Sequence, residues 1–153
     1  MDTPSVALPA SAEDGPVSHA IFRLARLHRM TAGRLLRRAG LHPGQELVMM
    51  RLWDAGPQRQ ADLAAVTDAD SATMTRTIQR LERAGFVRRE PSADDRRVTI
   101  VSPTVASRGL RVQVEQVWRE LEDATLGDLS PAERTAALAV LGRLEANLAE
   151  AQR

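Results

Sequence analysis

Apolar residues recur at helical spacing near both ends of this chain. From Val17 to Leu35 the positions of one seam lie alternately four and three residues apart, which places them on one face of an α-helix. Near the other end, residues 130–133 form a Ser-Pro-Ala-Glu capping box with proline at the first helical position. The same spacing then runs from Ala137 to Ala151. Narrow seams of this kind usually pack against another helix, so both terminal helices are predicted to have a helical partner.

Four further helices are predicted between these ends, three of them before residue 85. Pro43 is expected to open the first of them, which continues to Ala55 and stops before a Gly-Pro pair. A short helix is expected over residues 60–66. After a polar turn, Asp70 is a good N-cap for a longer helix that ends at Ala84, because its carboxylate can accept hydrogen bonds from the free N–H groups of the first turn.

The pattern changes from helical spacing to alternation after this helix. Residues 86–90 and 97–101 are predicted to be two short strands joined by a polar loop of hairpin length. A long helix is then expected to start at Pro103. The middle of this order, a short helix, a longer helix and a hairpin, is typical of a winged helix-turn-helix.

We therefore predict a mainly α fold with a small β-hairpin wing. The winged helix-turn-helix lobe is expected over residues 41–102. Residues 17–40 and 103–151 are expected to supply N- and C-terminal dimerisation helices. Residues 1–16 are expected to form a flexible N-terminal tail, and they lack the basic start of a secretory signal.

Composition excludes several classes of protein. The 153 residues contain no cysteine, which removes disulfides and thiolate metal ligands. No apolar run approaches the roughly 20 residues needed to span a bilayer, so no membrane partner is predicted and a cytoplasmic location is expected. Because the sequence has no Gly-rich phosphate loop, HExxH helix or nucleophile elbow, we predict no enzyme, no cofactor and no metal site.

The formal net charge of +1 hides an uneven distribution of charge. Residues 71–97 contain seven Arg and four acids, whereas residues 120–153 contain three Arg and seven acids. A polyanion such as DNA would therefore contact the middle of the chain. All 21 basic residues are Arg, which is more typical of the codon bias of a GC-rich genome than of a functional choice, although the planar guanidinium does suit phosphate and base contacts.

The helix that follows Asp70 has the side chains expected of a DNA reader. Met74, Ile78 and Leu81 form one apolar stripe, which leaves short hydroxyls and Arg or Gln side chains on the other faces. Side chains of these types read base edges and phosphates in a major groove. They are Ser71, Thr73, Thr75, Arg76, Gln79 and Arg80. A merely solvated helix face could have the same composition, and the basic hairpin that follows is what favours DNA binding.

Four motifs in the middle of the chain carry a family resemblance. They are residues 60–64 (QADLA), 71–76 (SATMTR), 80–87 (RLERAGFV) and 94–98 (DDRRV). In these motifs the chain resembles the multiple antibiotic resistance regulator (MarR) family. The resemblance implies an obligate homodimer with a winged helix-turn-helix in each subunit and an interface formed by the first and the last two helices. It also places the six polar residues named above on the recognition helix.

The resemblance also assigns roles to the wing and implies a ligand. The family's wing motif, Asp-x-Arg, falls on Asp95 and Arg97, which implies that Arg97 enters the minor groove and that Asp95 orients it. Arg96 is then the expected phosphate contact. In this family small anionic aromatic ligands bind between the dimer helices and the winged lobe, so such a ligand is an expected partner. Arg59 departs from the family pattern, which has a Ser or Thr cap before the short helix.

Three other features leave alternatives open. His28, in the seam of the first helix, is either a hydrogen-bonded interface residue, as we favour, or a ligand-pocket or metal-binding residue. Trp53 is either a core residue or a surface on which a ligand stacks. These two are the candidate effector-pocket residues. Residues 19–40 contain six Arg and no acid; they face either the DNA flanks or, as we favour, the acidic C-terminal region of a partner subunit.

The leading functional prediction is a sequence-specific DNA-binding transcriptional regulator. As a homodimer it would bind a pseudo-palindromic double-stranded DNA operator and repress transcription there. A small-molecule effector would release it from the DNA. Its two recognition helices would enter successive major grooves, with half-sites roughly 10 bp apart. The alternative is a winged helix that binds protein without specific DNA binding. The hydroxyls and Arg residues kept on the recognition helix argue against that alternative.

Overall fold

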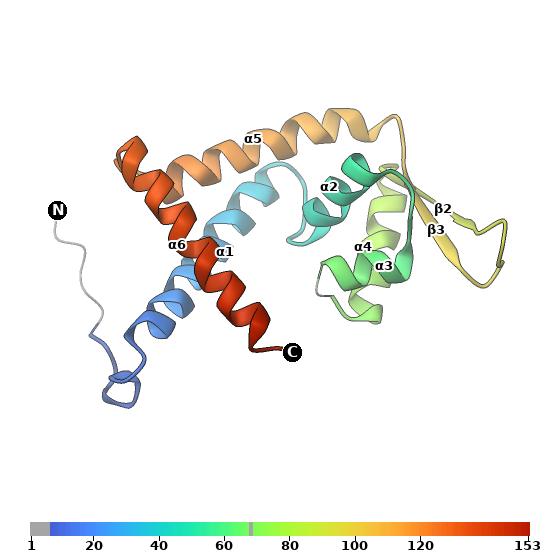
Figure 1. Cartoon of the computed structure of the whole chain (residues 1–153). Coiled ribbons are helices and arrows are strands. Elements are labelled where there is room, and N and C mark those ends of the chain that lie inside the picture. Colours follow the sequence, from blue (N-terminus) through green and yellow to red (C-terminus); the bar gives the residue numbers. More distant parts are fainter. Residues whose placement is uncertain (1–6, 68) are drawn as a thin grey trace.

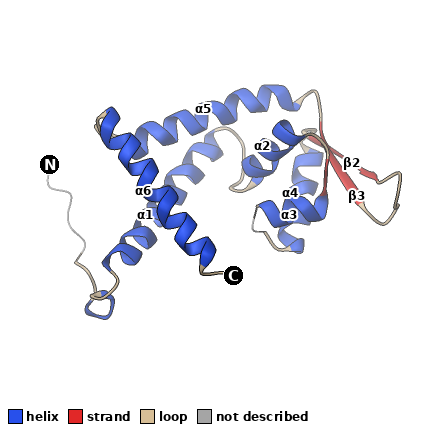
Figure 2. Cartoon of the chain, viewed as in Figure 1, coloured by secondary structure: helices blue, strands red, loops and turns tan. Residues whose placement is uncertain are grey.

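The computed structural model describes residues 7–67 and 69–153, so residues 1–6 of the predicted tail lie outside the described part. Within this part the chain forms six α-helices and a three-stranded antiparallel sheet, which confirms the predicted fold class (Figure 2). A 3-10 turn, η1 (Ala10–Ala12), precedes the helices α1 (Pro16–Arg38), α2 (Gln45–Ala55), α3 (Gln60–Val66), α4 (Ser71–Arg83), α5 (Ser107–Leu126) and α6 (Pro131–Glu150). The strands are β1 (Gln58–Arg59), β2 (Val87–Pro91) and β3 (Thr99–Pro103). None of the helices in the described ranges combines the length and the apolar character needed to cross a membrane.

Helix α5 connects the two ends of the molecule (Figure 1). At one end, the β2–β3 hairpin projects from a lobe that contains α2, α3 and α4. At the other end, α1 packs along α5, and α6 turns back from the end of α5 toward α1. The hairpin is therefore placed as a wing, far from the terminal helices.

A two-residue strand that the sequence pattern did not predict completes the sheet. The strand order is β1-β3-β2, with Arg59 opposite Ile100 and Arg89 opposite Val101. Strand β1 thereby ties the start of α3 to the base of the wing. Two paired residues are too few to produce a detectable alternation of apolar and polar positions, which explains why β1 was missed.

The second helix begins two residues later than predicted, because Pro43 lies before α2 and not in its first turn. Gly44 has a left-handed backbone with a φ of 95°, which favours glycine and does not continue a helix. Its N–H donates to Glu46 Oε2 at 2.8 Å. Burial nevertheless raises the pKa of the Glu46 carboxyl above its usual value. The left-handed turn at Gly44 thus sets the start of α2 at Gln45.

The long helix also begins later than predicted, at Ser107 and not at Pro103. Pro103 is the last residue of β3 and pairs with β2. Thr104 then holds the chain against the turn after α4, because its N–H donates to Phe86 O at 3.0 Å and its hydroxyl donates to Gly85 O at 2.6 Å. Strand β2 lies one residue later in the chain than predicted, and β3 lies two residues later. The reason is the same, because extended pairing continues through Pro103.

Both predicted N-caps are present. Asp70 Oδ1 accepts the Thr73 N–H at 2.7 Å, and this hydrogen bond holds the pKa of the Asp70 carboxyl below its usual value. Ser130 and Glu133 form the reciprocal capping box, with hydrogen bonds of 2.7 and 3.3 Å. These side chains satisfy N–H groups that the first helical turn cannot, so they fix where α4 and α6 begin.

The core lies between the lobe helices, α5 and the sheet. Its side chains are aliphatic or Met, in keeping with the 3% aromatic content of the chain. Burial of one such side chain stabilises the fold by roughly 1.5–3 kcal/mol. The fully buried members include Val48, Met49, Leu52, Leu63, Ile78 and Val101.

The terminal helices bury little within one chain. Helix α6 has no buried residue among its 20, and α1 has buried residues only near its C-terminal end. Leu141 and Leu148 of the predicted seam are 51% and 60% exposed. With Ile21 and Leu144 they line an apolar hollow of about 430 Å³ between α1 and α6. Contiguous apolar surface left open in this way is typical of an interface with another protein chain.

Candidate nucleic-acid interface and ligand hollow

Helix α4 presents a polar face because its opposite face is packed into the core. Met74, Ile78 and Leu81 are at most 2% exposed, and the Asp70 cap fixes the start of the helix. The residues predicted to contact DNA therefore point away from the core, but to different extents. Ser71, Thr73, Arg76 and Arg80 are exposed, and Thr75 and Gln79 are half-buried.

Thr75 is engaged in contacts within the protein. Its hydroxyl donates to Ser71 O at 2.9 Å and accepts from the Gln60 side-chain amide at 3.2 Å. Because Gln60 is the first residue of α3, this hydrogen bond fixes α3 relative to α4. In this structure Thr75 is thus a positioning residue. Arg76 and Arg80 have the longest reach among the exposed residues.

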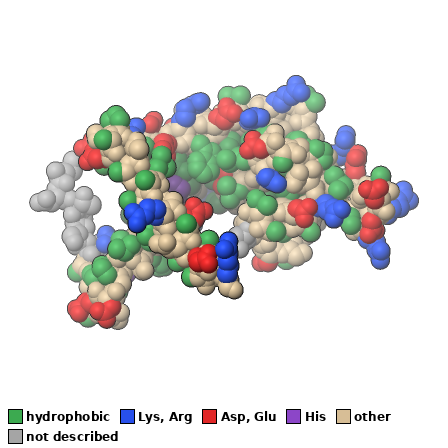
Figure 3. All heavy atoms as spheres, viewed as in Figure 1, with side chains coloured by type: hydrophobic (Ala, Val, Ile, Leu, Met, Phe, Trp, Pro, Cys, Tyr) green, Lys and Arg blue, Asp and Glu red, His purple; other side chains and the backbone are tan. Residues whose placement is uncertain are grey.

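The tip of the wing brings Asp95 and Arg97 together. Asp95 Oδ1 accepts from the backbone N–H of Arg97 at 3.0 Å and from its Nε at 3.3 Å, while Asp95 O accepts the Val98 N–H at 2.9 Å. The Arg97 side chain is 92% exposed, and Arg96 is also exposed. Charged side chains of both signs gather at this tip, at the right of Figure 3. The carboxylate therefore limits the directions open to a guanidinium that otherwise lies in solvent.

A hollow of about 580 Å³ lies between the wing and the starts of α3 and α4. Arg59 and Arg97 both line it, together with Ser71 and Thr99. Sequence analysis treated Arg59 only as a lost cap, and its side chain indeed makes no capping hydrogen bond to α3. The β1–β3 pairing is what brings this guanidinium near the wing. Two cations around one hollow suit the phosphate backbone of a nucleic acid.

A salt bridge joins the end of α4 to the wing. Glu82 Oε1 accepts from Arg89 Nε at 3.2 Å and from Nη2 at 3.0 Å, and Glu82 Oε2 accepts the Arg89 backbone N–H at 3.1 Å. These hydrogen bonds from Arg89 hold the pKa of the Glu82 carboxyl below its usual value. Three bonds between one pair of residues fix the direction of β2 relative to α4.

We expect Glu82→Gln to reduce the acid sensitivity of folding. The folded protein favours ionised Glu82, so its stabilising contribution is complete above the usual pKa of 4.5 and is lost as the pH falls through the lower folded-state pKa. In thermal unfolding, the wild type should melt above the variant at pH 7, and the difference should shrink below pH 4.5.

The control for this experiment is Glu90→Gln. Glu90 forms an exposed pair with Arg88 at 2.9 Å on the same wing. Exposed pairs contribute little to stability, so its melting difference should be small at every pH. A melting difference for Glu82→Gln that stays constant from pH 7 to pH 3 would contradict the role assigned to the ionised carboxylate.

The candidate effector-pocket residues, His28 and Trp53, lie in separate hollows. His28 lines a hollow of about 210 Å³ between α1 and the end of α5, with Leu24 and Thr31 among its neighbours. Trp53 lines a hollow of about 510 Å³ between α2 and α5. Within one chain, the two residues therefore do not form a single pocket.

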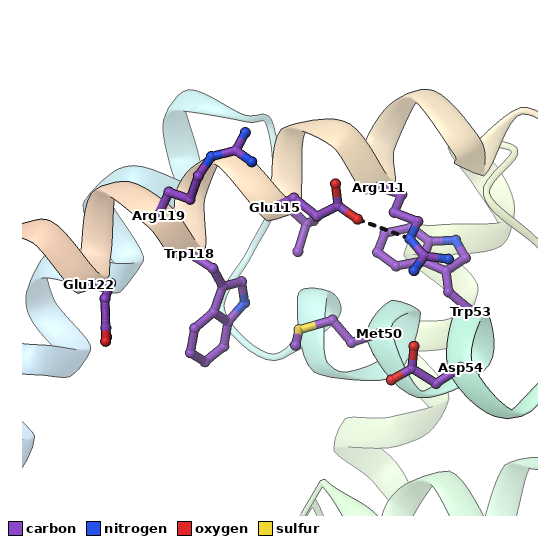
Figure 4. Close-up of a pocket in the computed structure, with 9 residues that line it drawn as sticks. Met50, Trp53, Asp54, Arg111, Glu115, Trp118, Arg119 and Glu122 are labelled. Atoms are coloured by element: carbon purple, nitrogen blue, oxygen red, sulfur yellow. Dashed lines mark hydrogen bonds and ion pairs between the residues drawn. The ribbon is translucent and has the colours of Figure 1, made fainter. Parts of the chain in front are cut away.

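Trp118 is a pocket residue that sequence analysis missed. It extends from α5 into the hollow that Met50 and Trp53 line from α2 (Figure 4). One feature of the sequence could have pointed to it, because tryptophan is rare in this chain and occurs only twice. Their wide separation along the chain concealed that they meet in one hollow.

The segment that forms α2, α3, α4 and most of the wing also matches a known family. The match is to the MarR family and covers residues 41–99. Residues 41–99 thus carry the sequence pattern of the MarR family. The family resemblance noted from the four motifs is thereby confirmed.

Proteins similar to this chain bear the names of transcriptional regulators, not of enzymes. The HTH-type transcriptional repressor NicR of Pseudomonas putida is 31% identical over 100 residues, which cover 65% of this chain and less than two thirds (63%) of the repressor. A crystal structure of MarR matches with a TM-score of 0.79 at 26% identity and covers 92% of this chain and 95% of that one. BpsR of Bordetella bronchiseptica, whose DNA binding is regulated by 6-hydroxynicotinic acid, matches with a TM-score of 0.75 at 26% identity, over 87% and 95% of the two chains.

Proposed function

We propose that this MarR-family chain is a sequence-specific DNA-binding transcriptional regulator that acts as a repressor at a double-stranded operator. The observation that carries the proposal is the wing, where Arg97 extends into solvent and Asp95 fixes its direction. Helix α4 adds the exposed Arg76 and Arg80 on the same lobe. The relative NicR, named as a transcriptional repressor, supports the same function.

In this proposal the regulator works as a homodimer. Residues 17–40 and 103–151 form its dimerisation region, and residues 41–102 form the DNA-binding lobe. The open apolar faces of α1 and α6 support this division, because a helix that buries none of its residues is not held by its own chain. Two-fold symmetry then places the two α4 helices in successive major grooves of a pseudo-palindromic operator. His28 belongs to the dimerisation region and not to the ligand site.

A small planar aromatic effector modulates DNA binding in the same proposal. Its site is the hollow between α2 and α5, whose volume of about 510 Å³ falls within the range of about 300–1,000 Å³ for ligand pockets. The hollow lies where the lobe meets a dimerisation helix, so an occupant changes the angle between them. The structurally similar BpsR, regulated by 6-hydroxynicotinic acid, supports an aromatic effector.

Selection of DNA from a random duplex pool by the full-length protein tests this function. We expect enrichment of an inverted repeat whose half-sites lie roughly 10 bp apart, as two recognition helices related by two-fold symmetry require. The enriched duplex should also bind more tightly than a scrambled duplex of the same composition. Equal binding to both duplexes would contradict the proposal and would favour a winged helix that binds protein.

A further inference from the structure

The hollow between α2 and α5 gathers aromatic surface in a chain that has very little of it. The sequence has four aromatic residues, two Phe and two Trp, and both Trp line this hollow. Trp53 comes from α2 and Trp118 from α5, with Met50 also on the α2 side (Figure 4). Indole rings and a thioether form a flat, polarisable lining that suits a planar aromatic guest.

The two indoles are held to different extents. Trp53 Nε1 donates to Ser107 Oγ at 3.0 Å, and that buried hydroxyl donates to Thr104 O at 2.7 Å. The Trp53 ring is therefore fixed before any ligand binds. Trp118 is 39% exposed and extends from α5 toward α2, so its ring remains open to a guest.

The charges around the hollow are unevenly paired. Arg111 Nε donates to Glu115 Oε1 at 3.1 Å, so these two charges compensate one another. Arg119 donates to Gln116 Oε1 at 3.3 and 2.8 Å, and its guanidinium points away from α2 in Figure 4.

Two carboxylates of the lining remain without a partner. Asp54 from α2 and Glu122 from α5 have no hydrogen bond or ion pair from any side chain in residues 7–67 and 69–153. Both are exposed, and they lie on the two helices that also carry the indoles. Three carboxylates against two guanidiniums leave the lining with a net negative charge, which the hollow combines with aromatic faces.

We propose that this hollow binds a planar aromatic cation, such as a protonated or quaternised nitrogen heterocycle, and not the anionic ligand that the family resemblance implies. The face of an indole attracts a cation electrostatically, and carboxylates nearby add to that attraction. An anionic guest would instead face Asp54 and Glu122, and it could reach Arg111 only by displacing Glu115. The effect of such a ligand on DNA binding rests on the proposed function, but its binding to the protein does not.

The test compares two bicyclic probes of nearly equal shape and opposite charge. The DNA-free, full-length protein is titrated with N-methylquinolinium and with quinoline-2-carboxylate in a calorimeter at pH 7. We expect N-methylquinolinium to bind at least about tenfold more tightly, the difference expected when one probe gains a cation–π contact that the other cannot make. Trp118→Leu should weaken binding of the cation, because it removes the open aromatic face.

Charge variants then distinguish the effect of the two lining carboxylates on probe affinity from the effect of the protein's overall charge. The double variant Asp54→Asn, Glu122→Gln should lower the affinity for N-methylquinolinium by about tenfold and leave or improve that for quinoline-2-carboxylate. Asp123→Asn is the matched control, because it removes one charge from α5 at a residue that does not line the hollow. It should change neither affinity by more than about twofold, since exposed charges outside the site are screened.

Three results would each overturn the inference: the anion binds as tightly as the cation, neither probe binds at millimolar concentration, or the double variant binds the cation like wild type. Because these titrations contain no DNA, they remain informative if the selection experiment finds no operator. If an operator is found and the cation does not bind, the ligand class fails and the regulator function stands.

Discussion

A chain carrying both Leu141→Glu and Leu148→Glu is expected to sediment as a monomer and to lose specific operator binding. The two leucines are 51% and 60% exposed on a helix that buries none of its own residues, so they are available to a second chain. Two charges in that seam would have to be desolvated in any dimer. Since specific binding is commonly about 10³-fold or more tighter than non-specific binding, we expect the monomer to retain only the non-specific level.

Ala146→Glu is the matched control for this experiment. It adds a carboxylate to the same helix, on the face turned away from the seam of Leu141 and Leu148. Its sedimentation and operator binding should resemble those of the wild type. Circular dichroism of both variants checks that the lobe remains helical. If the double variant remained a dimer and bound the operator normally, α6 would not be part of the interface.

Arg97→Ala is expected to weaken operator binding by about 1–3 kcal/mol and to leave the melting temperature unchanged. The side chain is 92% exposed and has no part in the core, so within the described part of the protein its removal breaks only the hydrogen bond to Asp95. The loss should be larger on operators with A·T-rich flanks, because a narrow minor groove concentrates negative potential around an inserted guanidinium. Fluorescence anisotropy on A·T-flanked and G·C-flanked duplexes measures both effects.

Asp95→Ala should give a smaller defect of the same kind. It removes the carboxylate that accepts from Arg97 at 3.0 and 3.3 Å, but it leaves the guanidinium in place. The double variant should lose less than the sum of the two single losses, because Asp95 acts through Arg97. Unchanged affinity of all three variants on both duplexes would show that the wing does not contact DNA.

Arg59→Ala provides a contrast within the same hollow. If this guanidinium contacts a phosphate, its removal should weaken specific and random duplexes alike and lower the slope of log affinity against log salt by about one unit. Arg97 should instead show the dependence on flanking sequence. The pair of variants thus separates a contact that positions the protein from one that reads the shape of the groove.

Local chemistry explains which parts of the fold were predictable. Asp70 and Ser130 cap their helices as expected, because an N-cap depends only on residues within one turn. The short α3 has the predicted bounds, and Met74, Ile78 and Leu81 are buried as one stripe. Periodicity and capping are properties of a few neighbouring residues, so the sequence alone is sufficient to reveal them.

Contacts between distant segments explain what was missed. Strand β1 exists only because Gln58 and Arg59 pair with β3, and Pro103 is extended because β3 pairs with β2. Likewise, Trp118 becomes a pocket residue only because α5 crosses α2. The hydrogen bond from Gln60 to the Thr75 hydroxyl is another contact that joins two helices and that no local pattern reveals. No pattern along the chain carries this information.

Helix α5 runs from the base of the wing to the turn before α6, so it acts mechanically as a lever arm (Figure 1). Its 20 residues make it about 30 Å long. A tilt of about 5° at the α6 end carries the wing end through about 2.6 Å, slightly more than the 1–2 Å helix shifts of known allosteric interfaces. In a two-fold dimer the two wings move in opposite directions, which doubles the change in their separation. In the proposed regulator, a guest that shifted α5 by so little against α2 would therefore move Arg97 further than a hydrogen bond can stretch.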